Sequence, residues 1–268
     1  MTAMAYHRPR SVAEAAKLAA GDPDARVLAG GQSVLPSMKL GLLTPSAFID
    51  LAGIADLQGI RTDGKNVVVG AMVTHASAAA SRDVQTRIAA LAHLAEGIGD
   101  PQVRNRGTIG GSLANSDPAA DYPAAALGLG ATIHTSKRTI AADDYFKGLF
   151  ATALEPGELI TAVSFPIPDQ AGYVKFRQAA SRFALVGVFV ARFGKAVRVA
   201  VTGAGPCAFR AKGLEDALAR KFAPDSCTGV TVAAAALNMD IHGSAAYRAH
   251  LIPVLAARAV AMARGSAE

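Results

Sequence analysis

Two short glycine-rich segments place the strongest constraint on what this chain can fold into. The first, Ala29-Gly30-Gly31-Gln32-Ser33, follows a short apolar run typical of a strand and precedes a helical stretch. The second is Thr108-Ile109-Gly110-Gly111-Ser112, directly after Gly107. Paired glycines let a backbone approach a ligand closely and turn several N–H groups to one side, which suits a diphosphate. Either segment alone is usually an ordinary turn, but two with hydroxyl side chains favour a dinucleotide.

Other nucleotide motifs fit less well. Neither segment matches GxxxxGK[ST], so an ATP-type phosphate loop is not supported. A third segment, Gly203–Ala208, has the GxGxxA spacing of a dinucleotide fingerprint. However, it follows a strand of antiparallel character, and the acidic residue near the required offset, Asp225, stands in a turn. We therefore expect the end of a strand there, with Pro206 starting a helix.

Metal chemistry is not expected on this chain. Its only cysteines are Cys207 and Cys227, whereas an iron–sulfur cluster usually needs four thiolates. The six histidines show no metal-ligand spacing such as HExxH. Any metal must therefore be bound by another polypeptide.

Composition narrows the class further. Apolar residues make up 51% of the chain, as in a globular protein that forms a core. The net charge is +6, but the basic residues form no run and tryptophan is absent, so nucleic-acid binding is not supported. No apolar stretch reaches the roughly 18 residues of a transmembrane helix. The first ten residues lack the apolar part of a signal peptide, and we expect a cytoplasmic protein.

The pattern of the chain predicts three parts. Residues 1–58 read as a small α/β unit, residues 59–168 as a second unit, and residues 172–268 as a third after the proline-rich linker 166–169. Apolar spacing and end signals predict helices over 11–20, 33–40, 74–81 and 83–98, with Asp100-Pro101 as a break. Strands are expected over 26–29, 47–50, 66–69, 131–135 and 160–165. The third unit should hold an antiparallel meander (172–177, 185–193, 197–202) followed by two or three helices.

In combination, these motifs resemble a known family. AGGQS at 29–33, TIGGS at 108–112 and DPAADYP at 117–123 resemble the FAD-binding (medium) subunit of the xanthine dehydrogenase and aerobic carbon monoxide dehydrogenase family. The segment Tyr6–Ser11, GELI at 157–160 and Lys175–Phe183 also stand in the family's order, so the resemblance spans essentially the whole chain.

The resemblance implies an α+β fold of the vanillyl-alcohol-oxidase type. An N-terminal α/β lobe (1–58) and a second α+β lobe (59–168) would form a two-lobed FAD-binding domain. Residues 172–268 would form the flavoprotein C-terminal domain, an antiparallel sheet with helices. FAD would lie between the two lobes.

The resemblance also implies a set of cofactor-binding residues. They are Leu28, Ala29, Gly30, Gly31, Gln32, Ser33, Val103, Gly107, Thr108, Ile109, Gly110, Gly111, Ser112, Ala114, Asn115, Asp121, Leu159, Ile160, Arg177 and Phe183. The two glycine-rich segments would wrap the diphosphate from opposite sides. Asp121 would accept hydrogen bonds from sugar or ribityl hydroxyls, although a turn or N-cap role before Pro123 is an alternative. Leu159 and Ile160 would contact the cofactor, or belong to the core.

The sequence departs from the family pattern near the expected flavin ring. Arg177 replaces a lysine, Arg182 replaces an acidic residue, and Phe183 keeps an aromatic face for stacking without a phenol. Either cation at position 177 would stabilise a reduced, anionic flavin. No catalytic residue or metal ligand is expected on the chain.

The function implied is electron transfer within a molybdenum hydroxylase. A large subunit with the molybdenum cofactor would oxidise the substrate, and a small subunit with [2Fe-2S] clusters would relay electrons to FAD on this chain. The final acceptor would be NAD, a quinone or oxygen, and the assembly a dimer of heterotrimers. Two alternatives are a self-contained FAD-dependent oxidoreductase and a non-catalytic nucleotide-binding assembly module.

Overall fold

The computed structural model describes residues 4–265 and begins with a small parallel sheet. Its strand order is β1 (Ala5–His7), β3 (Ala47–Asp50) and β2 (Arg26–Leu28), flanked by α1 (Val12–Gly21) and followed by short 3-10 turns over Leu51–Gly53 and Ala55–Leu57. The Ser11 side chain accepts a hydrogen bond from the Glu14 backbone N–H, and Glu14 accepts one from Arg10. This reciprocal cap is why α1 begins where the sequence predicted. The first glycine-rich segment connects β2 to α2 (Val34–Lys39).

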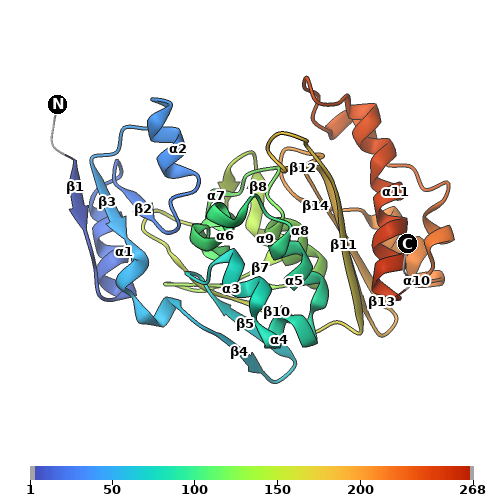
Figure 1. Cartoon of the computed structure of the whole chain (residues 1–268), viewed down its shortest axis with the longest axis horizontal. Helices are drawn as coiled ribbons and strands as arrows, with labels where there is room; N and C mark the ends of the chain where they lie inside the picture. The colour runs from blue at the N-terminus through green and yellow to red at the C-terminus, as the bar shows by residue number, and fades with distance from the viewer. Residues whose placement is uncertain (1–3, 266–268) are drawn as a thin grey trace.

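A five-stranded antiparallel sheet forms the middle of the molecule (Figure 1). Its order is β4 (Ile60–Asp63), β5 (Asn66–Gly70), β10 (Ile160–Pro166), β6 (Thr132–Thr135) and β7 (Thr139–Ala141). Around it lie α3 (His75–Ala80), α4 (Arg82–Arg87), α5 (Ala89–Glu96), α6 (Pro101–Arg106), α7 (Ile109–Asn115), α8 (Tyr122–Leu129) and α9 (Ala142–Tyr145). A small hairpin, β8 (Phe146–Gly148) and β9 (Ala151–Thr152), follows α9. Every residue of α8 is buried, so this helix packs against other parts of the protein on all of its sides.

Two expectations for this region were wrong. The helix expected over 83–98 is two helices, because Ile88 leaves the helical region with φ −140° and ψ 65°. The expected break at Asp100-Pro101 is present, since α5 ends at Glu96, and the Asp100 side chain caps a further helix, α6, whose first residue is Pro101. The second glycine-rich segment is mostly helix, since α7 begins at Ile109 with Thr108 as its cap.

The C-terminal part contains the predicted meander. Strands β11 (Gln170–Arg177), β12 (Ala184–Phe193), β13 (Ala196–Thr202) and β14 (Phe209–Arg210) pair antiparallel in that order. Helices α10 (Lys212–Arg220) and α11 (Ala245–Ala263) cover one face, with 3-10 turns over Pro224–Cys227 and Ala234–Ala236 between them, and α8 packs on the other face. The helix expected at Pro206 is absent: the chain bends there into β14, and α10 begins six residues later.

Alternation along β12 explains why this sheet has helices on both faces. Phe189 and Ala191 belong to the larger core shared with the middle sheet, whereas Val188 and Val190 belong to the core under α10 and α11. Successive side chains of a strand point to opposite faces, so a strand that is apolar at every position is buried on both. None of the helices in residues 4–265 has the length and apolar character to cross a bilayer.

The packing of α11 depends on a glycine. A Cβ atom added to Gly172 in β11 would lie 2.0 Å from the Ala259 carbonyl oxygen. We expect Gly172→Ala to lower the free energy of unfolding by about 1–3 kcal/mol, because backbone atoms must move to admit the methyl group. Gly213→Ala in α10 is the matched control: its Cβ would meet only Val230 at 3.5 Å, and the change should stay within about 1 kcal/mol. Urea unfolding measures both, and equal effects would contradict this packing.

Candidate functional site

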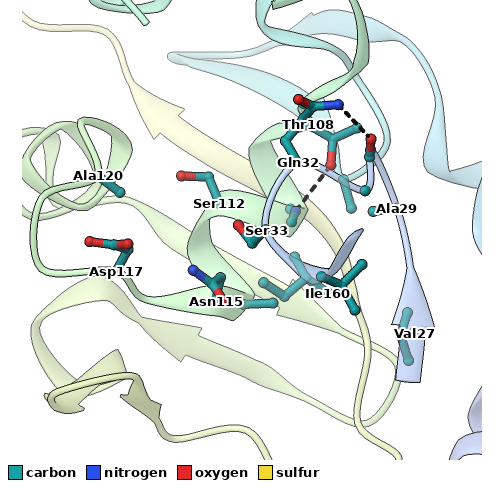
Figure 2. A pocket seen from close by; sticks show the side chains of 18 of the residues that line it. Val27, Ala29, Gln32, Ser33, Thr108, Ser112, Asn115, Asp117, Ala120 and Ile160 are labelled. Atoms are coloured by element: carbon teal, nitrogen blue, oxygen red, sulfur yellow. Dashed lines mark hydrogen bonds between the residues drawn. The ribbon is translucent and has the colours of Figure 1, made fainter. Parts of the chain in front are cut away.

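A cavity of about 500 Å³ lies between the first glycine-rich segment, helix α7 and the start of β10. Most residues singled out from the sequence line it: Ala29, Gly30, Gly31, Gln32, Ser33, Val103, Gly107, Thr108, Gly110, Gly111, Ser112, Ala114, Asn115, Asp121, Leu159, Ile160 and Phe183. Figure 2 shows the segment with Ala29, Gln32 and Ser33 lying beside the helix that carries Ser112 and Asn115. Segments almost eighty residues apart in the sequence therefore form one site.

The two glycine-rich segments touch through their backbones. A Cβ atom on Gly30 would lie 2.1 Å from the Arg106 carbonyl oxygen and 2.7 Å from the Gly107 Cα. Only glycine permits this approach, because a methyl group would occupy the space of the neighbouring backbone. Gly31 has φ +73°, a conformation that L side chains rarely adopt. Glycine is therefore required at position 30 for steric reasons and is favoured at position 31 by the backbone conformation.

Free backbone donors are concentrated in the first segment. Within the part of the chain that the structure describes, the N–H groups of Gly30, Gly31, Gln32 and Ser33 donate to no protein acceptor. The helical hydrogen bonds of α2 start only with the Leu35 N–H, which donates to the Gly31 carbonyl oxygen. Successive free amides next to a cavity form an anion-binding surface.

The second segment differs, because the amides of Ile109, Gly110, Gly111 and Ser112 already donate to protein acceptors. The Ile109 and Gly110 N–H groups donate to the carbonyl oxygens of Val73 and Ala71 at 3.1 and 2.9 Å. The Gly111 N–H donates to the Thr108 hydroxyl at 3.1 Å. The start of α7 is thus anchored to the strand end of β5, and it lines the cavity with the backbone of Gly110 and Gly111 and with side chains such as Ser112 and Asn115.

Asp121 stands at the boundary between the cavity and the C-terminal sheet. Its side chain is 5% exposed, and the Lys175 ammonium lies 2.8 Å from one carboxylate oxygen and 3.0 Å from the other. The Tyr173 hydroxyl also donates to it. Burial raises the pKa of Asp121, and the ammonium of Lys175 opposes that rise. Asp121 occupies the N-cap position of α8 without a capping hydrogen bond, so its carboxylate is not a helix cap.

The C-terminal sheet also holds the segment before Asp121. The Thr202 hydroxyl, at the end of β13, donates to the carbonyl oxygens of Pro118 and Ala120 at 2.9 and 2.6 Å. The Gly203 N–H donates to Pro118 as well. This wall of the cavity is therefore positioned by residues that lie more than eighty positions later in the chain.

Glu158 was missed by the sequence reasoning, although it belongs to the GELI motif. Its buried carboxylate accepts from both the Arg138 guanidinium, at 3.1 Å, and the Thr135 hydroxyl, at 2.6 Å. These hydrogen bonds lower the pKa of Glu158 from 4.5 to about 2, with Arg138 making the largest contribution. The ion pair fixes the turn immediately before Leu159 and Ile160, which line the cavity.

His75 is a second lining residue that the sequence did not reveal. It is 5% exposed, and its Nδ1 atom has no hydrogen-bond partner among the residues that the structure describes. Burial lowers the pKa of His75 from 6.5 to about 4, so the ring is neutral at physiological pH. A Cβ on Gly107 would lie 2.5 Å from its Nε2 atom, which gives a steric reason for that glycine. The only sequence signal next to His75 is Thr74, directly before the helix. A threonine in that position indicates a helix cap and does not indicate a binding site.

Three expected residues lie outside the lining. Ile109 is fully buried in the core, and Leu28 is half-buried on β2, where its neighbour Val27 lines the cavity instead. Arg177 is exposed at the end of β11. Residues that the sequence reasoning did not select also line it: Arg26, Val27, Val34, Ser37, Leu43, Leu51, Ala71, Met72, His75, Ile98, Asp117, Ala120, Leu154 and Glu158. Apolar residues such as Met72 carry no motif that separates a cavity wall from a core.

Comparison with known proteins identifies the family. Residues 2–168 match the model of the FAD binding domain in molybdopterin dehydrogenase. The chain belongs to this family. The carbon monoxide dehydrogenase medium chain of Afipia carboxidovorans is 37% identical over 98% of this chain and 97% of that protein. The nicotine 6-hydroxylase medium subunit of Paenarthrobacter nicotinovorans is 36% identical over 97% of each chain.

Solved structures agree with the sequence relatives. Reconstituted CO dehydrogenase from Oligotropha carboxidovorans contains a chain that superposes with a TM-score of 0.89 at 34% identity and covers 99% of each chain. Quinoline 2-oxidoreductase from Pseudomonas putida 86 gives 0.86 at 32% identity over 98% of each. The chain is an FAD-binding medium subunit of the molybdenum hydroxylase family, FAD is its cofactor, and its role is electron transfer in an oxidoreductase. In residues 4–265, no three His, Cys, Asp or Glu side chains are grouped to hold a metal ion.

The Glu158 ion pair predicts a pH dependence. Because the pKa is lowered on folding, the stabilisation is fully present above pH 4.5 and is lost as the pH falls towards 2. Glu158→Gln should reduce the free energy of unfolding by about 1–3 kcal/mol at pH 7, and the gap to the unmodified chain should shrink below pH 4.5. Glu96→Gln, at an exposed site, is the control. Urea unfolding at several pH values measures the gap, and a constant gap would refute the assignment.

Proposed function

We propose that the cavity is the FAD site of this medium subunit and that the first glycine-rich segment holds the diphosphate. The free N–H groups of Gly30, Gly31, Gln32 and Ser33 carry the proposal, since aligned backbone donors bind phosphate oxygens without needing a cation. Side chains of Ser112 and Asn115 face the same space and would supply donors from the other side. The cavity volume of about 500 Å³ lies within the range of cofactor sites.

The proposed position of the diphosphate suggests roles for the other lining residues. Leu159 and Ile160 would form an apolar wall, and Phe183 would cover the isoalloxazine ring from the β11–β12 turn. Asp121 would accept hydroxyl hydrogen bonds with an orientation fixed by Lys175 and Tyr173. Among the residues that the structure describes, no hydrogen bond or ion pair fixes the Arg177 side chain in a comparable way. Its place outside the lining therefore weakens the expectation that it neighbours the ring.

The architecture of the site suits the fold implied by the sequence. We propose a vanillyl-alcohol-oxidase-type arrangement, with lobes 1–58 and 59–168 and a C-terminal domain over 172–268. The parallel sheet, the middle antiparallel sheet and the C-terminal sheet are separate sheets, and the family match ends at residue 168, which supports these boundaries. The first lobe would contribute the diphosphate segment and the second the remaining walls.

The chain would act as an electron-transfer subunit beside a molybdenum-cofactor large subunit and a [2Fe-2S] small subunit. Bound FAD supplies both one-electron and two-electron transfer, which lets it connect single-electron clusters to NAD, a quinone or oxygen. This chain's residues need only place and polarise the cofactor. The match to medium subunits over nearly the full length of the chain disfavours a self-contained oxidase. A dimer of heterotrimers in the cytoplasm completes the proposal.

Charge at the first segment should control flavin binding. Ser33→Asp places a carboxylate beside the free amides, so we expect FAD affinity to fall by at least about a hundredfold from repulsion of the diphosphate. Thr228→Asp adds the same charge at an exposed position of the C-terminal part and should leave affinity within about twofold. Fluorescence titration of the apoprotein with FAD measures both variants. Unchanged affinity in Ser33→Asp would exclude this segment as the diphosphate site.

A further inference from the structure

A second cavity, of about 360 Å³, lies at the far end of the C-terminal sheet and shares no lining residue with the first. It forms where Gln170 starts β11, Arg192 stands one residue before the end of β12, and helix α10 ends at Arg220. Arg192 continues the alternation of Val188 and Val190, so it lies on the sheet face covered by α10 and α11. The proposed electron-transfer role makes no use of this place.

Positive charge collects around the second cavity. Four cationic side chains line it: Arg192, Lys195, Arg220 and Arg264. Among the residues described, none of the four forms an ion pair, and no acidic side chain lines the cavity. The opposite face of the same sheet differs, since Arg198 and Arg210 both pair with Asp143 there.

Neighbouring negative charge does not balance these cations. Asp169 accepts a hydrogen bond from the Gly194 N–H beside the cavity, and so contributes one carboxylate. The carbonyl ends of α10 and α11 each contribute about half a negative charge. An excess of about two positive charges therefore remains among the described residues. Such an excess next to a concave surface attracts a multivalent anion.

Arg192 is held in place for binding. Its Nε donates to the Gly194 carbonyl oxygen at 2.9 Å and its Nη1 to the Gln170 side chain at 3.4 Å, while the guanidinium lies 5.5 Å from the centre of the Phe222 ring. The Phe222 carbonyl oxygen in turn accepts from Arg264. Among the described residues 4–265, the Nη2 group of Arg192 has no protein acceptor. A guanidinium fixed in this way loses little side-chain freedom when an oxyanion binds.

We propose that this cavity binds the phosphate groups of a small soluble anion, such as a diphosphate or a nucleotide. Guanidinium N–H groups match phosphate oxygens in geometry and charge, and three arginines with one lysine provide donors on several sides of the space. The cavity is large enough for a diphosphate and lies within the size range of small-molecule sites. This second site lies on the C-terminal part and shares no residue with the FAD cavity.

The test is calorimetric titration of the full chain, saturated with FAD so that the first cavity is filled. Inorganic pyrophosphate and ADP are the probes, and equal affinities would identify the phosphates as the recognised group, whereas tighter ADP binding would add a nucleoside contact. Arg192→Gln and Lys195→Gln should each weaken pyrophosphate binding by about tenfold. Arg258→Gln removes an equal charge from an exposed position of α11 outside the cavity and should stay within about twofold.

Three results would overturn the proposal. The first is no saturable binding of millimolar pyrophosphate by the unmodified chain. The second is an Arg258→Gln effect as large as that of Arg192→Gln, which would mean diffuse attraction to net charge. The third is binding of a polyglutamate peptide without binding of pyrophosphate, which would assign the cavity to an acidic segment of a protein partner. Circular dichroism of each variant establishes that the fold is retained.

Discussion

The close backbone contact between Gly30 and the Arg106–Gly107 peptide is the constraint on which the site depends. A side chain at position 30 would overlap the Arg106 carbonyl oxygen, so the two segments can meet only through a glycine. The contact brings the end of β2, in the parallel sheet, against the start of α7 beside the middle sheet. A cavity then forms between them, with free amides on one side and side chains on the other.

Unequal use of backbone donors gives the two glycine-rich segments different roles. At the start of α7 the amides bind Val73, Ala71 and Thr108, so their glycines allow close packing against β5. In the first segment the amides remain available. The C-terminal sheet positions a further wall of the cavity, the segment 117–121. Thr202 and Lys175 of that sheet form hydrogen bonds and an ion pair with this segment. The residues that line the cavity and the residues that position them therefore belong to different sheets.

Sequence reasoning reached the family, the order of the main elements and most of the cavity lining, because glycine pairs and apolar alternation are local signals. It failed where the cause was tertiary. Nothing local shows that Ile88 breaks a helix, that Gly110 sits inside one, or that His75 faces the cavity. Glu158 was overlooked because its partner Arg138 lies on a neighbouring strand connection, and pairing across a sheet has no fixed spacing in sequence.

Hydrogen–deuterium exchange of the backbone amides, with and without FAD, tests the central claim most directly. The account predicts that FAD slows exchange most at Gly30–Ser33, where the donors are free in the protein alone. It also predicts that Ile109–Ser112 exchange slowly before FAD is added and change little afterwards. Strong new protection at Ile109–Ser112 without any at Gly30–Ser33 would contradict the account and move the diphosphate to α7.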